Sequence, residues 1–133
     1  MIRKLFIYSL VLFLCACGHL QERRRVQTLD KAIDEYAYAL RWKRIDDAIS
    51  FHKNEDGTKP SIDVTLMNDV RVTGFSIDKK VLGKDMMDAV VTGEFKYYKE
   101  DYGTVHTLKF EQHWWFDEDA DRWYVKSPFP KFK

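Results

Sequence analysis

Cysteine, proline and glycine are all scarce in this chain of 133 residues, which has 2 Cys, 3 Pro and 6 Gly. The two cysteines, Cys15 and Cys17, lie close together near the N-terminus. We therefore expect neither a disulfide framework nor a metal site built on cysteine. With 32% charged and 45% hydrophobic residues, the composition is nevertheless that of a globular protein.

The chain also lacks an excess of charge of either sign, because 22 Lys and Arg stand against 21 Asp and Glu. A dedicated nucleic-acid-binding protein owes much of its affinity to a basic surface that contacts phosphates. The balance of charge therefore excludes this class, and we expect no nucleic-acid partner.

A long hydrophobic run is absent as well, although a short one is present. The largely apolar segment Leu5 to Ala16 has 12 residues, whereas a membrane-spanning helix needs roughly 20. The basic pair Arg3 and Lys4 precedes it, and this order is typical of an export signal. Cleavage after residue 16 would leave 117 of the 133 residues, which is the usual size of one compact domain.

The residues that end this run are Leu14, Cys15, Ala16, Cys17 and Gly18. They resemble the lipobox of bacterial lipoproteins, in which a leucine and a small residue precede the cysteine. The resemblance implies that Cys17 carries diacylglycerol on its sulfur and that cleavage separates it from Ala16. In Gram-negative lipoproteins an Asp after the lipid-bearing Cys favours the inner membrane. Gly18 at that position implies the outer membrane, on its periplasmic face.

Residues 17–27 are predicted to form the lipidated cysteine and a tether, and residues 28–133 a single domain. The tether contains three consecutive arginines, Arg23, Arg24 and Arg25. Two interpretations of these arginines remain open. They either rest on anionic head groups or belong to a solvated tether or a frayed first helical turn.

The domain is predicted to begin with a helix that has one buried face. Its apolar positions are Leu29, Ile33, Tyr36, Ala37 and Leu40. Thr28 is the expected N-cap. Because the apolar phase is lost at 41–44, we expect a break there and a shorter second helix ending near His52.

After residue 69 the apolar period changes to two, which predicts antiparallel strands. The expected strands cover 70–77, 87–97, 108–116 and the surroundings of 123–125. Gly74 is expected to mark a bulge, because the apolar phase shifts across it. Segment 61–67 fits either a helical turn or the start of a strand.

These elements predict an α+β domain, in which an N-terminal broken helix packs on a curved antiparallel sheet of about four strands. The pattern over residues 28–127 resembles the nuclear-transport-factor-two-like, cystatin-like superfamily. The resemblance lies in the helix broken within Tyr38–Ala48 and in the final strand pair Gln112–Phe116 and Arg122–Val125. More narrowly, the chain resembles small lipoproteins of proteobacteria.

Catalytic signatures are missing. No nucleophile and base occur in a recognisable arrangement, and there is no glycine-rich phosphate loop or Cys/His cluster. Asp117, Asp119 and Asp121 alternate like the start of a calcium loop, but Arg122 stands where that loop needs Gly. We interpret the segment as a solvated hairpin turn and expect His106 and His113 at the surface. The sequence therefore predicts a non-enzymatic protein with no cofactor and no metal.

Aromatic residues are concentrated near the C-terminus, where 12 of the 17 that follow residue 16 lie between Phe95 and Phe132. Some are expected to point away from the core and to contact a protein partner. This candidate interaction surface comprises Tyr98, Trp115, Tyr124, Phe129 and Phe132. Two alternatives remain open, since an outer aromatic face also stabilises a sheet through cross-strand pairs, and the tail also suits a clasp over the domain.

The superfamily resemblance implies a second hypothesis, in which a cone-shaped pocket binds or transforms a small molecule. The polar side chain expected to point inward is Gln112, and its predicted neighbours in such a pocket are Tyr97 and Tyr36. A glutamine can hydrogen-bond a ligand but cannot act as a general base.

Overall fold

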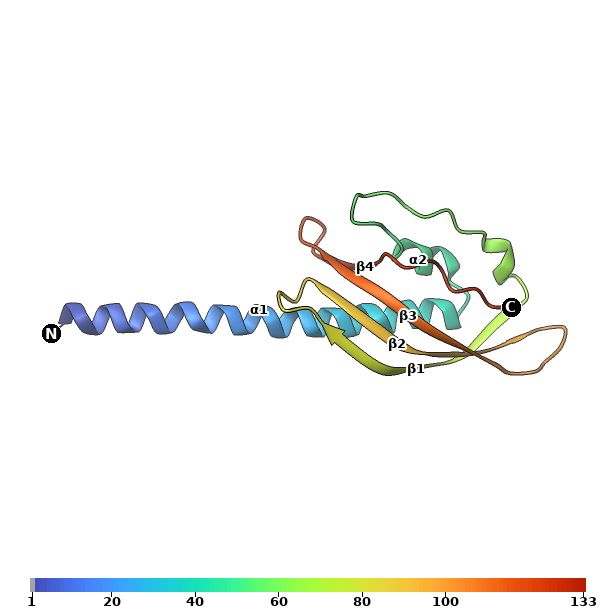
Figure 1. The fold of residues 1–133 in the computed structure, drawn as a ribbon, viewed down its shortest axis with the longest axis horizontal. Helices are drawn as coiled ribbons and strands as arrows, with labels where there is room; N and C mark the ends of the chain where they lie inside the picture. The colour runs from blue at the N-terminus through green and yellow to red at the C-terminus, as the bar shows by residue number, and fades with distance from the viewer. Residues whose placement is uncertain (1) are drawn as a thin grey trace.

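The computed structural model of the protein is an α+β fold, in which a long N-terminal helix packs on a four-stranded antiparallel sheet (Figure 1). It describes the backbone of residues 2–133 and the side chains of residues 2, 4, 8 and 17–133. The predicted signal peptide, residues 1–16, falls mostly on positions whose side chains lie outside the described residues. The elements in chain order are α1 Ile2–Arg41, α2 Ile45–Ser50, the 3-10 helix η1 Val64–Met67, β1 Val70–Leu82, β2 Asp88–Lys99, β3 His106–Asp117 and β4 Arg122–Val125.

Helix α1 is longer than the sequence pattern predicts. It runs without interruption through residues 17–27, so the predicted tether is helical and extends well beyond the sheet (Figure 1). Thr28 is therefore inside the helix, and its hydroxyl donates to the carbonyl of Arg25 instead of capping. The reason is local, since most residues of Gln21–Gln27 are good helix formers and extending an existing helix is easier than nucleating one.

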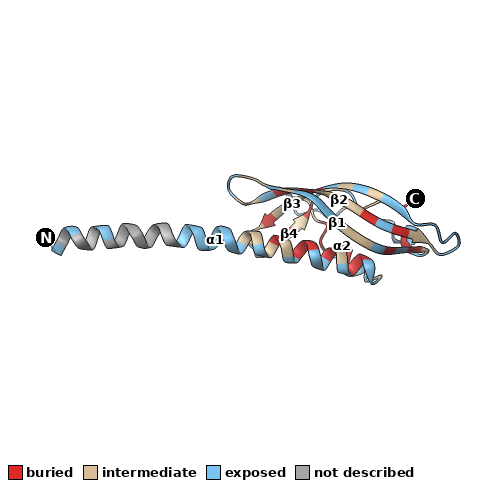
Figure 2. Cartoon of the chain, turned by 90° about the horizontal axis from the view of Figure 1, so that it is seen from below, coloured by how far each residue is buried: buried red, intermediate tan, exposed pale blue. Residues whose placement is uncertain are grey.

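The predicted break between the two helices is confirmed. Helix α1 ends at Arg41 and α2 begins at Ile45, with Lys43 in the left-handed region at φ 55°. The buried face of α1 is also confirmed, because its positions Leu29, Ile33 and Leu40 are at most 1% exposed. In Figure 2 the buried residues of α1 lie in the part of the helix that runs beside the sheet.

The sheet is a simple meander with strand order β1-β2-β3-β4. The bulge at Gly74 is confirmed by a register shift between Val72 and Gly74. Strand β1 continues to Leu82, past a second shift between Ile77 and Lys79 that the sequence pattern did not indicate. Segment 61–67 is resolved as a helical turn, since η1 begins after Asp63, whose carboxylate accepts from the backbone of Thr65 at 3.0 Å.

The core lies between α1 and one face of the sheet. The alternation expected of the strands is confirmed at Val91, Phe95, Trp114 and Trp123, which are at most 1% exposed, but not at Ile77, which is 41% exposed. One polar side chain on the sheet, Gln112, is buried with them. All clustered core residues lie between Leu29 and Phe132, so none of the described α1 residues before 29 belongs to this cluster.

Candidate functional site

The predicted lipidation and sorting positions lie on the projecting part of α1. Cys17 and Gly18 are both exposed, and a side chain at Gly18 would meet nothing within 4 Å. Among the described residues, no helix combines the length and the hydropathy needed to cross a membrane.

Of the three arginines Arg23, Arg24 and Arg25, two form ion pairs with the domain. Arg24 pairs with Asp121 at 3.3 Å, and Arg25 pairs with Glu118 at 3.2 Å, both in the hairpin between β3 and β4. The Arg25 side chain is only 12% exposed, and its guanidinium lies 4.6 Å from the ring centre of Phe116. Neither interpretation offered by the sequence describes Arg25, because it joins the projecting helix to the sheet.

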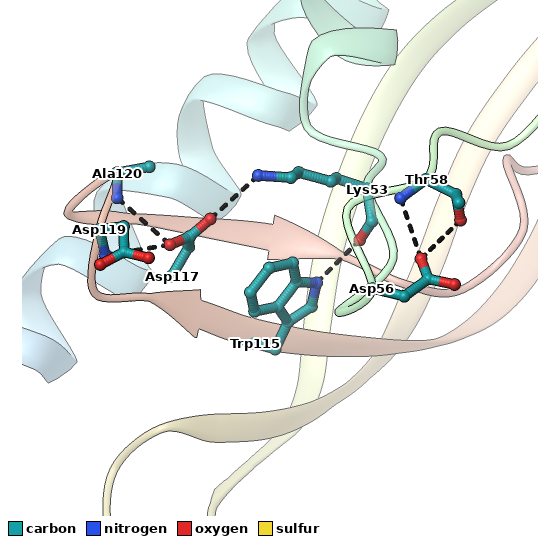
Figure 3. Close-up of polar contacts among 7 residues, drawn as sticks. All are labelled: Lys53, Asp56, Thr58, Trp115, Asp117, Asp119 and Ala120. Atoms are coloured by element: carbon teal, nitrogen blue, oxygen red, sulfur yellow. Dashed lines mark hydrogen bonds and ion pairs between the residues drawn. The ribbon is translucent and has the colours of Figure 1, made fainter.

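The outer face of the sheet carries the predicted pair Trp115 and Tyr124 on neighbouring strands. Their ring centres are 5.5 Å apart, and the Trp115 indole donates to the backbone carbonyl of Lys53 at 2.8 Å (Figure 3). The Lys53 ammonium lies 4.8 Å from the centre of the Tyr124 ring. Both aromatics are half-buried, so the segment after α2 partly covers this surface.

Lys53 is held over these rings by an ion pair with Asp117 at 3.0 Å (Figure 3). The hydrogen bond between them raises the pKa of Lys53 and lowers that of Asp117. Asp117 also accepts from the backbone of Asp119 and Ala120, as in an ordinary hairpin turn. Among the described side chains, no group of three or more His, Cys, Asp or Glu is arranged to hold a metal ion.

Other members of the predicted interaction surface lie elsewhere. Tyr98 is near one end of β2, whereas Trp115 pairs with Asp88 at the other end. Phe132 is only 6% exposed, and its ring packs 5.0 Å from that of Tyr97. Its assignment to a contact surface is therefore wrong, because the C-terminal tail folds back onto the open end of the core.

The rest of the tail is fixed in the same way. Phe129 is half-buried against the imidazole of His52, with ring centres 5.2 Å apart. The Tyr97 hydroxyl donates to the carbonyl of Lys133 at 2.8 Å. Of the two interpretations of the tail, the structure supports the clasp.

Of the three residues of the predicted pocket, Gln112 and Tyr36 lie close together, whereas Tyr97 lies apart from Gln112. Gln112 pairs with Val91, six residues along β2 from Tyr97. All three residues, Gln112, Tyr97 and Tyr36, are buried, and the clefts that we find on the surface are lined by other residues.

Tyr36 and Gln112 instead belong to a buried polar chain that sequence reasoning missed, because the apolar pattern did not place His52 in the core. The Tyr36 hydroxyl is 3.0 Å from His52 Nε2, and His52 Nδ1 is 3.0 Å from the carbonyl of Ser127. A carbonyl only accepts, so Nδ1 carries the proton and the neutral ring accepts from Tyr36 at Nε2. Burial lowers the pKa of His52 to about 4 and raises that of Tyr36.

The chain of polar groups continues onto β3. The Trp114 indole donates to Gln112 Oε1 at 3.3 Å, which fixes the orientation of the amide. Gln112 offsets part of the rise in the Tyr36 pKa, but its Nε2 atom lacks a partner within hydrogen-bond geometry among the described residues. This buried chain connects α1, the segment after α2, β3 and the tail, and it presents no reactive group to solvent.

A cleft of about 610 Å³ opens between α1, α2 and the edge of β4. Asp34 and Tyr38 line it from α1, Asp47 from α2 and Arg122 from β4. The sequence analysis did not single out this site, and the available signal was Tyr38 with Trp42, an aromatic pair on the polar side of an amphipathic helix.

Comparison of the chain with models of protein families, with curated proteins and with solved structures finds no match.

Proposed function

We propose that the chain is a bacterial lipoprotein, anchored to a membrane through Cys17. The sequence from Leu14 to Gly18 carries this proposal, and the exposure of Cys17 on the projecting part of α1 supports it. Several acyl chains hold a protein at a membrane far more durably than one, since each buried methylene adds about 0.8 kcal/mol. With Gly18 after the cysteine, and for a Gram-negative source, the anchor lies in the outer membrane and the domain faces the periplasm.

The domain itself acts as a non-enzymatic binding or scaffold domain for a protein partner. The buried polar groups support this proposal, because Tyr36, His52 and Trp114 hydrogen-bond within the protein and do not meet solvent. The half-exposed Trp115 and Tyr124 lie side by side on the outer face of the sheet, where they are available to a partner.

Within the α+β class, we propose that the fold is nuclear-transport-factor-two-like or cystatin-like. It is supported by the order of the elements, a broken helix followed by a four-stranded meander. The alternative function, a pocketed member of that superfamily acting on a small molecule, is favoured by one observation, the unpartnered amide nitrogen of Gln112.

Replacement of the lipid-bearing cysteine tests the anchor. In Cys17→Ala the only acceptor thiol of the lipobox is gone, so incorporation of labelled palmitate should fall to background and the precursor should remain unprocessed. Cys15→Ala is the matched control, because Cys15 leaves with the signal, and its labelling should equal that of the wild type. Labelling that survives Cys17→Ala would show that the anchor is wrongly assigned.

The choice of membrane is tested separately by Gly18→Asp. This change places the inner-membrane signal after the lipidated cysteine and, since the site is open, should leave the fold intact. We expect the protein to move from outer-membrane to inner-membrane fractions in a density gradient. An unchanged distribution would contradict the sorting proposal while leaving lipidation itself unaffected.

A further inference from the structure

The cleft between α1, α2 and β4 has an apolar floor and charged walls. Ala39 and Phe51 form part of the floor, and both are buried. Its volume of about 610 Å³ lies in the usual range for sites that hold small ligands.

Arg122 is one of the charged residues that line this cleft. Its guanidinium carbon lies 4.8 Å from the ring centre of Phe51 and 5.0 Å from that of Tyr124. Stacking on two rings holds the planar group in place and leaves its N–H edge available for a carboxylate. Within the described part of the chain, no carboxylate forms an ion pair with it.

The carboxylates of the cleft differ in whether they have an ion-pair partner. Asp47 pairs with Arg44 at 2.6 Å, and Glu35 pairs with Lys31 at 3.7 Å. Asp34 has no ion-pair partner among the described side chains. The cleft therefore combines one uncompensated cation with one uncompensated anion.

An exposed aromatic pair borders the cleft. Tyr38 is 55% exposed and Trp42 62% exposed, and their ring centres are 6.0 Å apart. Tyr38 also lines the cleft. Exposed aromatic side chains of this kind are common anchors in binding surfaces.

We propose that this cleft binds a short zwitterionic peptide. A carboxylate of the peptide pairs with Arg122 in the bidentate manner that guanidinium favours. A cationic group pairs with Asp34, and an apolar or aromatic side chain lies between them against Tyr38 and the floor. The inference rests on the proposed role of the domain in binding, and it names the site and the chemistry of the partner.

Peptide titration of the full chain in detergent micelles tests the proposal. The probe is N-acetyl-Ala-Tyr-Lys with a free C-terminal carboxylate. One analogue is its C-terminal amide, and the other has norleucine in place of lysine. We expect the probe to bind, and each analogue to bind at least about tenfold more weakly, since each loses one charged contact.

Two variants test which residue of the cleft contacts each charged group of the peptide. Arg122→Gln should abolish the preference for the acid over the amide, and Asp34→Asn should abolish the preference for lysine over norleucine. Arg122→Lys keeps the charge without the planar fork and should retain part of the first preference. The matched controls Arg23→Gln and Asp78→Asn change exposed residues outside the cleft and should bind as the wild type does.

The proposal is overturned if the wild type binds none of the peptides at millimolar concentration. It is also overturned if the preference for the acid persists undiminished in Arg122→Gln with an unchanged circular dichroism spectrum. The lipid anchor is tested independently of the cleft. If palmitate labelling survives Cys17→Ala, the anchor is wrongly assigned, but the peptide affinities of the cleft do not change. Failure of the cleft in turn leaves the labelling result intact.

Discussion

Trp114→Ala should lower the free energy of unfolding by about 3–5 kcal/mol, the usual cost of truncating a buried tryptophan. Trp114 is 0% exposed, and its ring packs edge-on against Tyr36 and Phe51, with centroid distances of 5.9 and 6.1 Å. The truncation leaves a cavity between α1 and β3, and it also leaves Gln112 Oε1 without its donor.

Trp115→Ala is the matched control, because the neighbouring residue has the same side chain on the opposite face of β3. Trp115 is half-buried and loses one hydrogen bond to Lys53 and one aromatic contact, so we expect a cost of about 1–2 kcal/mol. Urea denaturation of residues 18–133, which retain the whole core cluster, measures both variants. A larger loss in Trp115→Ala would contradict the assigned strand faces, because a register error of one residue exchanges them.

Acidification from pH 7.5 to 5 should cost the folded domain about 2 kcal/mol through His52 alone. Its pKa is lowered from 6.5 to about 4 by burial. Between these values the unfolded chain binds a proton that the folded chain does not. The contribution of His52 is therefore constant above the unfolded pKa and is lost as the pH falls from about 6.5 towards 4.

His52→Gln isolates this effect. A glutamine can accept from Tyr36 but does not titrate, so the unfolding free energy of the variant should fall less between the two pH values. Urea denaturation of wild type and variant at pH 7.5 and 5 gives the difference, in which the contribution of the exposed carboxylates cancels. Equal slopes in the two proteins would show that His52 is not the buried neutral acceptor described here.

Periodicity predicts most of the helices and strands of the domain and the buried faces of α1 and β3, but not the helical course of residues 17–27 or the extension of β1 to Leu82. The 3.6-residue spacing from Leu29 to Leu40 predicts which face of α1 is buried, and the alternation in β3 separates Trp114 from Trp115. The shift of phase at Gly74 predicts the bulge. These features are local, because each depends on which neighbouring residues are apolar and not on what they pack against.

The tertiary structure alone decided which polar and aromatic groups meet. His52 lies beside Tyr36 and Ser127 only because the segment after α2 and the tail close over the core. Phe132 becomes a core residue for the same reason. Arg122 and Asp34 line the same cleft although 88 positions separate the two residues in the chain. Contacts between residues so distant in sequence depend on how helix, sheet and tail pack together. The local pattern of apolar residues does not determine that packing.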